Sequence, residues 1–181
     1  MRFTETLLKG SYTIDLTPFK DERGEFARTY CKKEFAEIGH TKEFVQFNQS
    51  YNLKKGTIRG MHYQVAPYSE IKLIRCVRGA VMDIIVDLRK DSPTFLQHIS
   101  VELSALNKKM IYVPQGFAHG FQTLEDNTEL IYHHTEYYTP EAEAGLNYND
   151  PALKLEWPLE VSVISEKDRQ NKPITNNFKG I

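Results

Sequence analysis

Apolar and polar residues alternate in short runs along most of the chain, and the runs at its centre are the clearest. Residues 57–64, 71–78 and 80–88 are rich in β-branched and aromatic residues, and turn residues at 67–69 separate the first run from the second. Alternation between turn signals is typical of β-strands with one buried face. We therefore predict strands in these three runs, with a loop joining the first two.

Shorter runs of the same kind flank this centre. A short helix is expected at residues 32–38, where Gly39 acts as a stop signal. A capping-box pattern beginning at Ser165 predicts a last short helix. A turn is expected at residues 21–24. Further strands are predicted at residues 11–17, 25–30, 44–51, 99–103, 110–113 and 130–135.

Many short strands separated by turns that contain Gly and Pro favour a β-sandwich or barrel. A jelly roll fits this pattern, and its two sheets enclose a cavity lined by side chains that can hold a small ligand. We expect one mainly β domain over residues 1–181, with a few short peripheral helices. Residues 1–45 are expected to supply partly peripheral strands and a helix, and residues 140–181 a C-terminal extension that packs on the barrel.

Composition excludes several classes of partner. The formal net charge of −1 argues against a general nucleic-acid binder, although it permits a local basic pocket for one small anion. No run approaches the roughly 20 apolar residues that cross a bilayer, and residues 1–9 lack an apolar signal core. Cys31 and Cys76 allow one disulfide, but two reduced thiols in a cytoplasmic protein are the preferred interpretation.

Ionisable residues interrupt the apolar strands, and they are the candidates for chemistry. Burying such a group is costly unless it is paired, so a cluster of them indicates a functional site. His62 and Lys72 are ten residues apart, an even spacing that places them on one face if the intervening loop keeps the count. The other members of this set are Asp83, His119 and Tyr132.

Each candidate also has a purely structural interpretation. His62 fits a hydrogen-bonded core histidine, Lys72 fits a side chain that snorkels from a sheet edge, and Tyr132 fits ordinary strand packing. Asp168 is the third residue after Ser165, so its spacing alone favours the reciprocal partner of a helix cap. Spacing therefore does not decide between structure and catalysis for these residues.

Three more polar residues have two interpretations of the same kind. Arg23 follows an acidic turn and fits a surface ion pair of little energy. Gln46 and Asn48 lie on the same side of the strand predicted at 44–51, where they either bind a ligand or satisfy backbone groups at a sheet rim.

The histidines do not form an obvious metal site. His62-Tyr63-Gln64 supplies one histidine where a metal-binding β-helix protein has two, although Glu70 and His119 are possible further ligands. His133 and His134 are adjacent and point to opposite faces of a strand. A glycine-rich phosphate loop and a nucleophile elbow are also missing. We therefore expect no metal and no cofactor.

A series of motifs runs in a fixed order from about residue 11 to residue 170. It consists of Asp21-Glu22-Arg23-Gly24-x-Phe26, Phe44-Val45-Gln46-Phe47-Asn48-x-Ser50, Arg59-Gly60-Met61-His62-Tyr63-Gln64, Lys72-Leu73-Ile74-Arg75, Val86-Asp87-Leu88-Arg89-x-x-Ser92-Pro93-Thr94, Pro114-x-Gly116-Phe117-Ala118-His119-Gly120-Phe121, Tyr132, Tyr137-Tyr138-x-Pro140-Glu141, Asp150-Pro151, Trp157-Pro158 and Ser165-x-Lys167-Asp168. This series resembles the dTDP-4-dehydrorhamnose 3,5-epimerase family of cofactor-independent nucleotide-sugar epimerases.

The resemblance implies a cupin-type jelly roll, also called a double-stranded β-helix, and a homodimer. It implies an isomerase whose substrate is a nucleoside-diphosphate 4-keto-6-deoxyhexose, with carbons 3 and 5 inverted by proton removal and return. His62 matches the family's base, Asp168 the carboxylate that orients it, Lys72 the group that stabilises the enolate oxygen, and Tyr132 the acid on the opposite face of the sugar. These four are the catalytic residues that the resemblance implies.

The resemblance also implies a substrate-binding set. Arg59 and Arg23 match phosphate contacts, and Arg23 is expected to come from the partner chain. Tyr138 matches an aromatic that stacks on the pyrimidine, and Phe19 is expected to flank the same region. The remaining matches are Gln46 and Asn48 at base- or phosphate-reading positions, His119 and Asp83 inside the cavity, and Phe26 on the motif that carries Arg23.

Two positions depart from the family pattern. Glu70 stands where many members have Gln, and Arg28 stands where the family has Glu. These departures leave open the nucleotide, which is dTDP, CDP or UDP, and whether one carbon or both are inverted. A 3,4-ketoisomerase, a metal-dependent cupin oxygenase and a non-catalytic sugar-binding cupin are the alternatives from other reaction classes.

Overall fold

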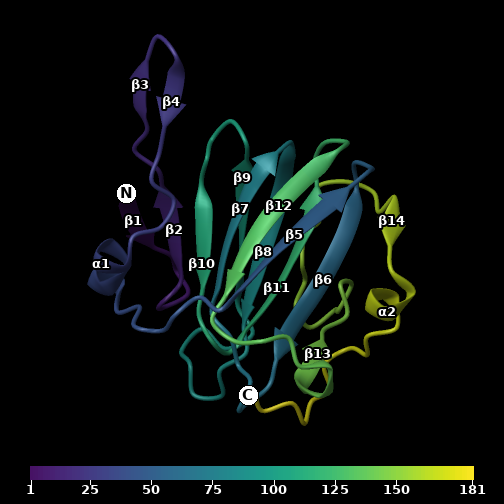
Figure 1. Cartoon of the computed structure of the whole chain (residues 1–181). Helices are drawn as coiled ribbons and strands as arrows, with labels where there is room; N and C mark the ends of the chain where they lie inside the picture. Colours follow the sequence, from purple (N-terminus) through teal and green to yellow (C-terminus); the bar gives the residue numbers. More distant parts are fainter.

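The computed structural model describes residues 1–181, and strands dominate it (Figure 1). Helical structure is confined to four short segments, which are α1 (Lys32–Phe35), η1 (Ala36–Ile38), η2 (Pro140–Ala142) and α2 (Glu166–Arg169), the η segments being 3-10 helices. The strands are β1 (Arg2–Glu5), β2 (Tyr12–Asp15), β3 (Phe19–Asp21), β4 (Gly24–Phe26), β5 (Gln46–Asn52), β6 (Thr57–Gln64), β7 (Lys72–Arg78), β8 (Ala80–Asp87), β9 (His98–Ser104), β10 (Met110–Val113), β11 (Phe117–Thr123), β12 (Thr128–His134), β13 (Glu143–Gly145) and β14 (Val163–Ile164).

Two sheets pack face to face, as the jelly-roll prediction requires. One sheet has the order β1-β2-β10-β7-β12-β5, and the other has the order β13-β6-β11-β8-β9 with β14 paired to β6. Apart from the parallel β14–β6 pair, neighbouring strands are antiparallel. Figure 1 shows the two sheets stacked at the centre of the molecule, so the mainly β jelly roll is confirmed.

The core between the sheets takes side chains from both of them. Its buried members include Ile74 of β7, Val81 of β8, Phe121 of β11 and Leu130 of β12. The outer face of the second sheet is also covered, because Leu146, Leu153 and Trp157 of the C-terminal segment pack over it. Strand β8 therefore carries a nearly continuous apolar run, as strands buried on both faces do.

The N-terminal elements match the predictions in part, because strands β1 and β3 were not predicted. The predicted helix at 32–38 is present as α1 followed by η1, and Gly39 ends it in the left-handed conformation with φ of 79°. The strand predicted at 25–30 is wrong beyond Phe26, because residues 27–30 pair with no strand. Tyr30 instead packs its ring at 4.9 Å from that of Phe35, so aromatic contacts rather than ladder bonds fix this segment.

The predicted turn at residues 21–24 joins β3 and β4 in a hairpin that projects beyond the sheets (Figure 1).

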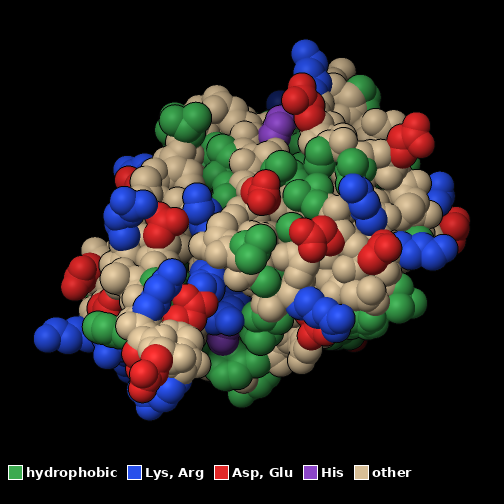
Figure 2. Space-filling view, turned by 90° about the horizontal axis from the view of Figure 1, so that it is seen from above, with side chains coloured by type: hydrophobic (Ala, Val, Ile, Leu, Met, Phe, Trp, Pro, Cys, Tyr) green, Lys and Arg blue, Asp and Glu red, His purple; other side chains and the backbone are tan.

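On the face shown in Figure 2, Lys and Arg side chains are interspersed with Asp and Glu. No helix has the length and apolar character needed to cross a membrane. Both cysteines are free, which decides against the disulfide, and burial raises the pKa of the Cys76 thiol to about 11.

Candidate active site

A cavity of about 260 Å³ opens between the two sheets. Strands β5, β7 and β12 supply one wall, and β6 and β11 supply the other. This is the arrangement expected for a ligand site in a jelly roll. The lining residues are Asn48, Gln49, Ser50, Arg59, His62, Lys72, His119, Phe121, Tyr132 and His134.

His62 on β6 is oriented by a carboxylate from the far end of the chain. Its Nε2 lies 2.6 Å from Oδ1 of Asp168, whose other oxygen accepts a hydrogen bond from the Gly60 N–H at 3.1 Å. The backbone N–H of Asp168 donates to the Ser165 hydroxyl at 3.0 Å, so this residue also takes part in the helix cap. Burial alone would raise the pKa of Asp168, but the hydrogen bond and charge of His62 hold it below its usual range. The carboxylate is therefore ionised beside the imidazole.

The close contact of β6 with β11 requires two glycines. Gly60 has φ of 118°, and a Cβ there would lie 2.6 Å from the Cα of Gly120 and 2.8 Å from the carbonyl oxygen of His119. Both obstacles are backbone atoms that cannot rotate away. The glycine between Arg59 and Met61 therefore allows β6 to carry His62 into the cavity against its neighbouring strand.

Lys72 at the start of β7 projects from the opposite wall. Its Nζ lies 3.0 Å from Oε1 of Glu70 and 3.5 Å from the carbonyl oxygen of His62. Its side chain is only 8% exposed, so the snorkelling alternative is wrong for this residue. A buried ammonium group at this position carries positive charge into the cavity.

Tyr132 lies on β12 in the same wall as Lys72, while His62 lies on the other wall. Its hydroxyl is 3.2 Å from the hydroxyl of Ser50. Burial raises the pKa of Tyr132 strongly, so the phenol is neutral and can donate a proton. His62 and Tyr132 thus face one cavity from two different sheets.

His119 and Asp83 form a second buried pair behind this site. Nε2 of His119 lies 2.8 Å from Oδ2 of Asp83, and Asp83 is fully buried. Burial raises the pKa of Asp83 in spite of the neighbouring imidazole, and its Oδ1 has no hydrogen-bond partner. His119 lines the cavity, whereas Asp83 reaches it only through His119.

Among the predicted nucleotide-binding residues, Arg59 and Asn48 line the cavity, whereas Gln46 and Tyr138 do not. Arg59 Nε donates to Oδ1 of Asn52 at 2.6 Å, which fixes the guanidinium near the cavity rim. Asn48 Oδ1 accepts from Gln46 Nε2 at 3.3 Å, so these two residues share one face as predicted. The backbone N–H of Tyr138 donates to Oε1 of Gln46 at 3.1 Å.

Three predicted site residues stay away from this cavity within one chain. Phe19, Arg23 and Phe26 lie on the projecting β3–β4 hairpin, where Phe19 is 77% and Phe26 75% exposed. Arg23 forms an exposed ion pair with Asp21 at 2.5 Å, as its structural interpretation requires. The role expected for Arg23 in a partner chain's site and the substrate-binding roles expected for Phe19 and Phe26 stay predictions.

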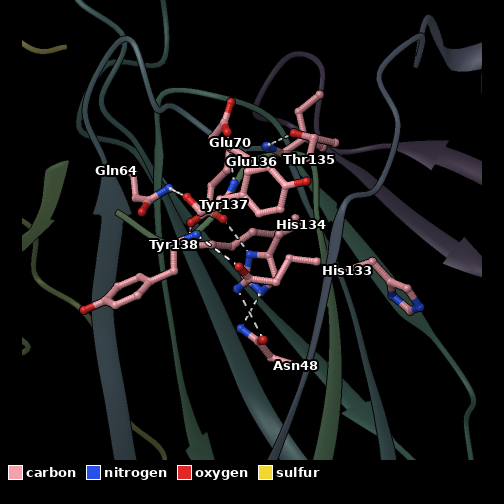
Figure 3. A network of polar contacts seen from close by, with 12 residues as sticks. Asn48, Gln64, Glu70, His133, His134, Thr135, Glu136, Tyr137 and Tyr138 are labelled. Atoms are coloured by element: carbon pink, nitrogen blue, oxygen red, sulfur yellow. Dashed lines mark hydrogen bonds and ion pairs between the residues drawn. The ribbon is translucent and has the colours of Figure 1, made fainter. Parts of the chain in front are cut away.

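Sequence reasoning missed several residues that line or support the cavity. His134 lines it while the adjacent His133 points away, as the alternation of a strand requires (Figure 3). Ser50 follows Asn48 at even spacing, so the strand pattern contained a signal for it. The sequence identifies Glu70 as a departure from the family pattern and a possible metal ligand, but its contact with His134 gives no signal, because the two residues are 64 positions apart in the chain. The other missed residues are Gln49, Asn52 and Phe121.

The two departures from the family pattern lie in different surroundings. Glu70 contacts Lys72 at the cavity wall, whereas Arg28 forms an exposed ion pair with Glu34 at 2.7 Å beside the first helix. No group of three or more His, Cys, Asp or Glu side chains is placed to hold a metal ion. The cavity brings together an imidazole paired with a carboxylate, the amino group of Lys72 and a phenol, which are the groups used in acid–base chemistry.

Comparison with known proteins agrees with this geometry. The family model described as dTDP-4-dehydrorhamnose 3,5-epimerase matches residues 5–176. A Pseudomonas aeruginosa protein of that name is 45% identical over 174 residues, covering 95% of this chain and 95% of that one. The crystal structure of a Bacillus anthracis dTDP-4-dehydrorhamnose 3,5-epimerase with TDP and PPi bound has 42% identity and a TM-score of 0.93, covering 96% of this chain and 99% of that chain.

A second solved structure contains a sugar nucleotide. The Legionella pneumophila dTDP-6-deoxy-D-glucose-3,5-epimerase, in complex with dTDP-4-keto-L-rhamnose, has 39% identity and a TM-score of 0.90, covering 95% of this chain and 92% of that chain. With the motif series, the cavity and these matches in agreement, the chain belongs to the dTDP-4-dehydrorhamnose 3,5-epimerase family.

Proposed function

We propose that this protein converts dTDP-4-dehydro-6-deoxyglucose to dTDP-4-dehydrorhamnose by inverting carbons 3 and 5 without a cofactor. The observation that carries the proposal is the placement of His62, paired with Asp168, on one wall of the cavity and of Tyr132 on the other. Inversion requires a base on one face of the sugar and a proton donor on the opposite face. The two sheets supply these groups from opposite sides.

The chemistry follows from the 4-keto group of the substrate. A ketone at carbon 4 acidifies the hydrogens on carbons 3 and 5, because the carbanion formed at either position delocalises into an enolate. His62 takes the proton as general base, and the ionised Asp168 stabilises the imidazolium that results. Lys72 stabilises the charge that develops on the enolate oxygen. Tyr132 then returns a proton from the other face.

The nucleotide is proposed to lie at the mouth of the cavity. Arg59 supplies the guanidinium for a phosphate, and Gln46, Asn48 and Tyr138 supply amide and aromatic groups for the base. We propose dTDP as this nucleotide because the Bacillus relative binds TDP and the Legionella relative binds a dTDP sugar. A CDP- or UDP-linked 4-keto sugar is the alternative substrate.

A homodimer is proposed to complete the site. The β3–β4 hairpin presents Phe19, Arg23 and Phe26 to solvent, and Phe47 on the edge strand β5 is 65% exposed. Exposed aromatic groups beside an arginine are typical of interface residues. In the dimer, Arg23 of one chain contacts the diphosphate held by the other.

We also propose that residues 1–181 form a single domain. Because both thiols are free, we propose the cytoplasm as the location of the enzyme.

Proton NMR of dTDP-4-keto-6-deoxyglucose in deuterated water tests the reaction. Deuterium at both C3 and C5, with the product of inverted configuration, is the expected result. Label at one carbon only would indicate a single-site epimerase, and binding without label would indicate a non-catalytic sugar-binding protein. Metal analysis of the purified protein distinguishes the epimerase from a metal-dependent oxygenase, because an oxygenase of that class requires a bound metal for activity.

A further inference from the structure

Glu70 is the closest partner of Lys72 in the cavity wall. Its Oε1 lies 3.0 Å from Lys72 Nζ, and its Oε2 lies 2.5 Å from Nδ1 of His134. All three side chains are buried, with exposed fractions of 8% for Lys72 and 10% for each of the other two. The only other contact of the ammonium is the hydrogen bond of 3.5 Å to the carbonyl oxygen of His62. Glu70 therefore fixes the position of Lys72.

The Glu70 carboxylate is ionised in this environment. Burial alone would raise the pKa of Glu70, but the hydrogen bond from His134 and the charge of Lys72 lower it below its usual range. A negative charge therefore lies directly beside the ammonium inside the cavity.

His134 is held on both sides of its ring. Its Nδ1 faces Glu70, and its Nε2 lies 3.3 Å from Nδ2 of Asn48 (Figure 3). With the Asn48 amide donating to Nε2, the ring proton is on Nδ1 and is donated to the carboxylate. The ring of Tyr132 stacks on that of His134 with centroids 6.1 Å apart. Figure 3 shows Glu70, His134 and Asn48 in one connected chain.

We propose that Glu70 is a positioning residue, which holds the Lys72 ammonium at the reacting end of the cavity and is itself held by His134 and Asn48. The inference rests on the proposed function, because it assigns Glu70 a role through the lysine that stabilises the enolate. The charged or titratable side chains that line this cavity are Arg59 and His62 from β6, Lys72 from β7, His119 from β11, and Tyr132 and His134 from β12, with Asp83 of β8 behind His119.

Two variants of Glu70 separate its position from its charge. Glu70→Ala removes the anchor, so the turnover number for deuterium exchange should fall about 10- to 100-fold while KM changes by less than about 3-fold. Glu70→Gln keeps an acceptor of nearly the same shape but removes the charge. Its turnover number should fall less than that of Glu70→Ala, because the amide oxygen can still accept a hydrogen bond from Lys72 and hold it in place.

The control is Glu43→Gln, which removes a carboxylate from an exposed ion pair with Lys32. This variant should keep the wild-type rate. Circular dichroism and thermal unfolding establish that each variant is folded, and Glu70→Gln carries the test if Glu70→Ala does not fold.

Failure of the inference can be told from failure of the proposed function. If the wild-type protein exchanges no deuterium, the proposed function is wrong and the positioning role with it. If the wild type exchanges and both Glu70 variants keep its turnover number, only the positioning role is wrong. A rise in KM with an unchanged turnover number would also overturn it, since that pattern belongs to a residue used only in binding.

Discussion

Asp168 lies 106 positions after His62 in the chain, yet its carboxylate Oδ1 is 2.6 Å from the imidazole Nε2. The short helix α2 brings it there, and the same residue uses its backbone N–H in the cap of that helix. The cap therefore uses only the backbone of Asp168, whereas its carboxylate, which a reciprocal cap would require, binds His62 and the Gly60 N–H. Orientation of the proposed base depends on how the C-terminal segment packs against β6.

Replacing this carboxylate should remove the orientation of His62 without unfolding the protein. Asp168→Asn keeps the shape and the backbone N–H of the cap, but it cannot stabilise an imidazolium. We expect the exchange rate to fall by about 10²- to 10⁴-fold, measured by proton NMR in deuterated water. Ser165→Ala is the matched control, because it removes the cap hydroxyl and should cost about 1 kcal/mol of stability. Equal losses of exchange in both variants would contradict the separate role of the carboxylate.

The sequence predicted the strands well because their signal is local. Alternation identified the runs that became β5 to β8, and it placed Gln46 with Asn48 on one face. The same local signal failed at residues 27–30, where the residues are compatible with a strand but no partner strand is present. Strand pairing is set by neighbours that a local pattern does not contain.

Tyr132→Phe tests the donor on the opposite wall. The ring still fills its position against Ser50, but it has no proton to return. We expect deuterium exchange to persist at a reduced rate while inverted product is lost, which NMR of the product distinguishes. Tyr112→Phe is the control, because Tyr112 does not line the cavity. Its hydroxyl lies 3.1 Å from Nδ1 of His40, and loss of this contact should cost only about 1 kcal/mol of stability. Full inversion by Tyr132→Phe would require a different acid.

Gly60→Ala tests the close approach of β6 to β11. Its Cβ would lie 2.6 Å from Gly120 Cα, so a backbone must move, and we expect a loss of at least about 2 kcal/mol in the free energy of unfolding. Gly39→Ala is the matched control, because Gly39 also has a positive φ, of 79°, but nothing lies within 4 Å of the added carbon. It should cost only about 1 kcal/mol. Urea denaturation measures both values, and equal losses would contradict the steric argument.

Asp87 should make stability fall in acid. Burial opposes its ionisation, but hydrogen bonds from Arg89, Ser92 and Thr94 lower its pKa to about 2. Because the pKa of Asp87 is lower in the folded state, ionised Asp87 stabilises the fold at pH values above its unfolded-state pKa of about 3.9. This stabilisation is lost as the pH falls toward about 2. The difference in unfolding free energy between wild type and Asp87→Asn should contain a pH-dependent part of about 2 kcal/mol that disappears over this window. A difference that stays constant from pH 6 to pH 2 would contradict the assignment.

The active-site residues needed more than local pattern. Even spacing suggested one shared face for His62 and Lys72, but they line the same cavity from two different sheets. The ionic partner of each lies outside its strand. Glu70 and His134 meet only because β7 and β12 are neighbours in the first sheet. Resemblance to the family supplied Asp168 as an active-site residue, whereas its spacing alone favoured the cap. The role of the β3–β4 hairpin is not set within one chain, because the only ionic partner of Arg23 there is Asp21.

Mixing two inactive variants tests whether Arg23 acts across a dimer. In a dimer of Arg23→Ala with His62→Ala, one of the two sites combines His62 from the first chain with Arg23 from the second, so that site is complete. Random assortment makes about half of the dimers mixed, so co-refolded protein should recover about a quarter of the wild-type activity, although each variant alone is nearly inactive. Mixing His62→Ala with Asp168→Ala is the control, because both residues belong to the same chain's site and the mixed dimer has no complete site. If the Arg23→Ala mixture recovers no more activity than this control, Arg23 acts within its own chain or not at all.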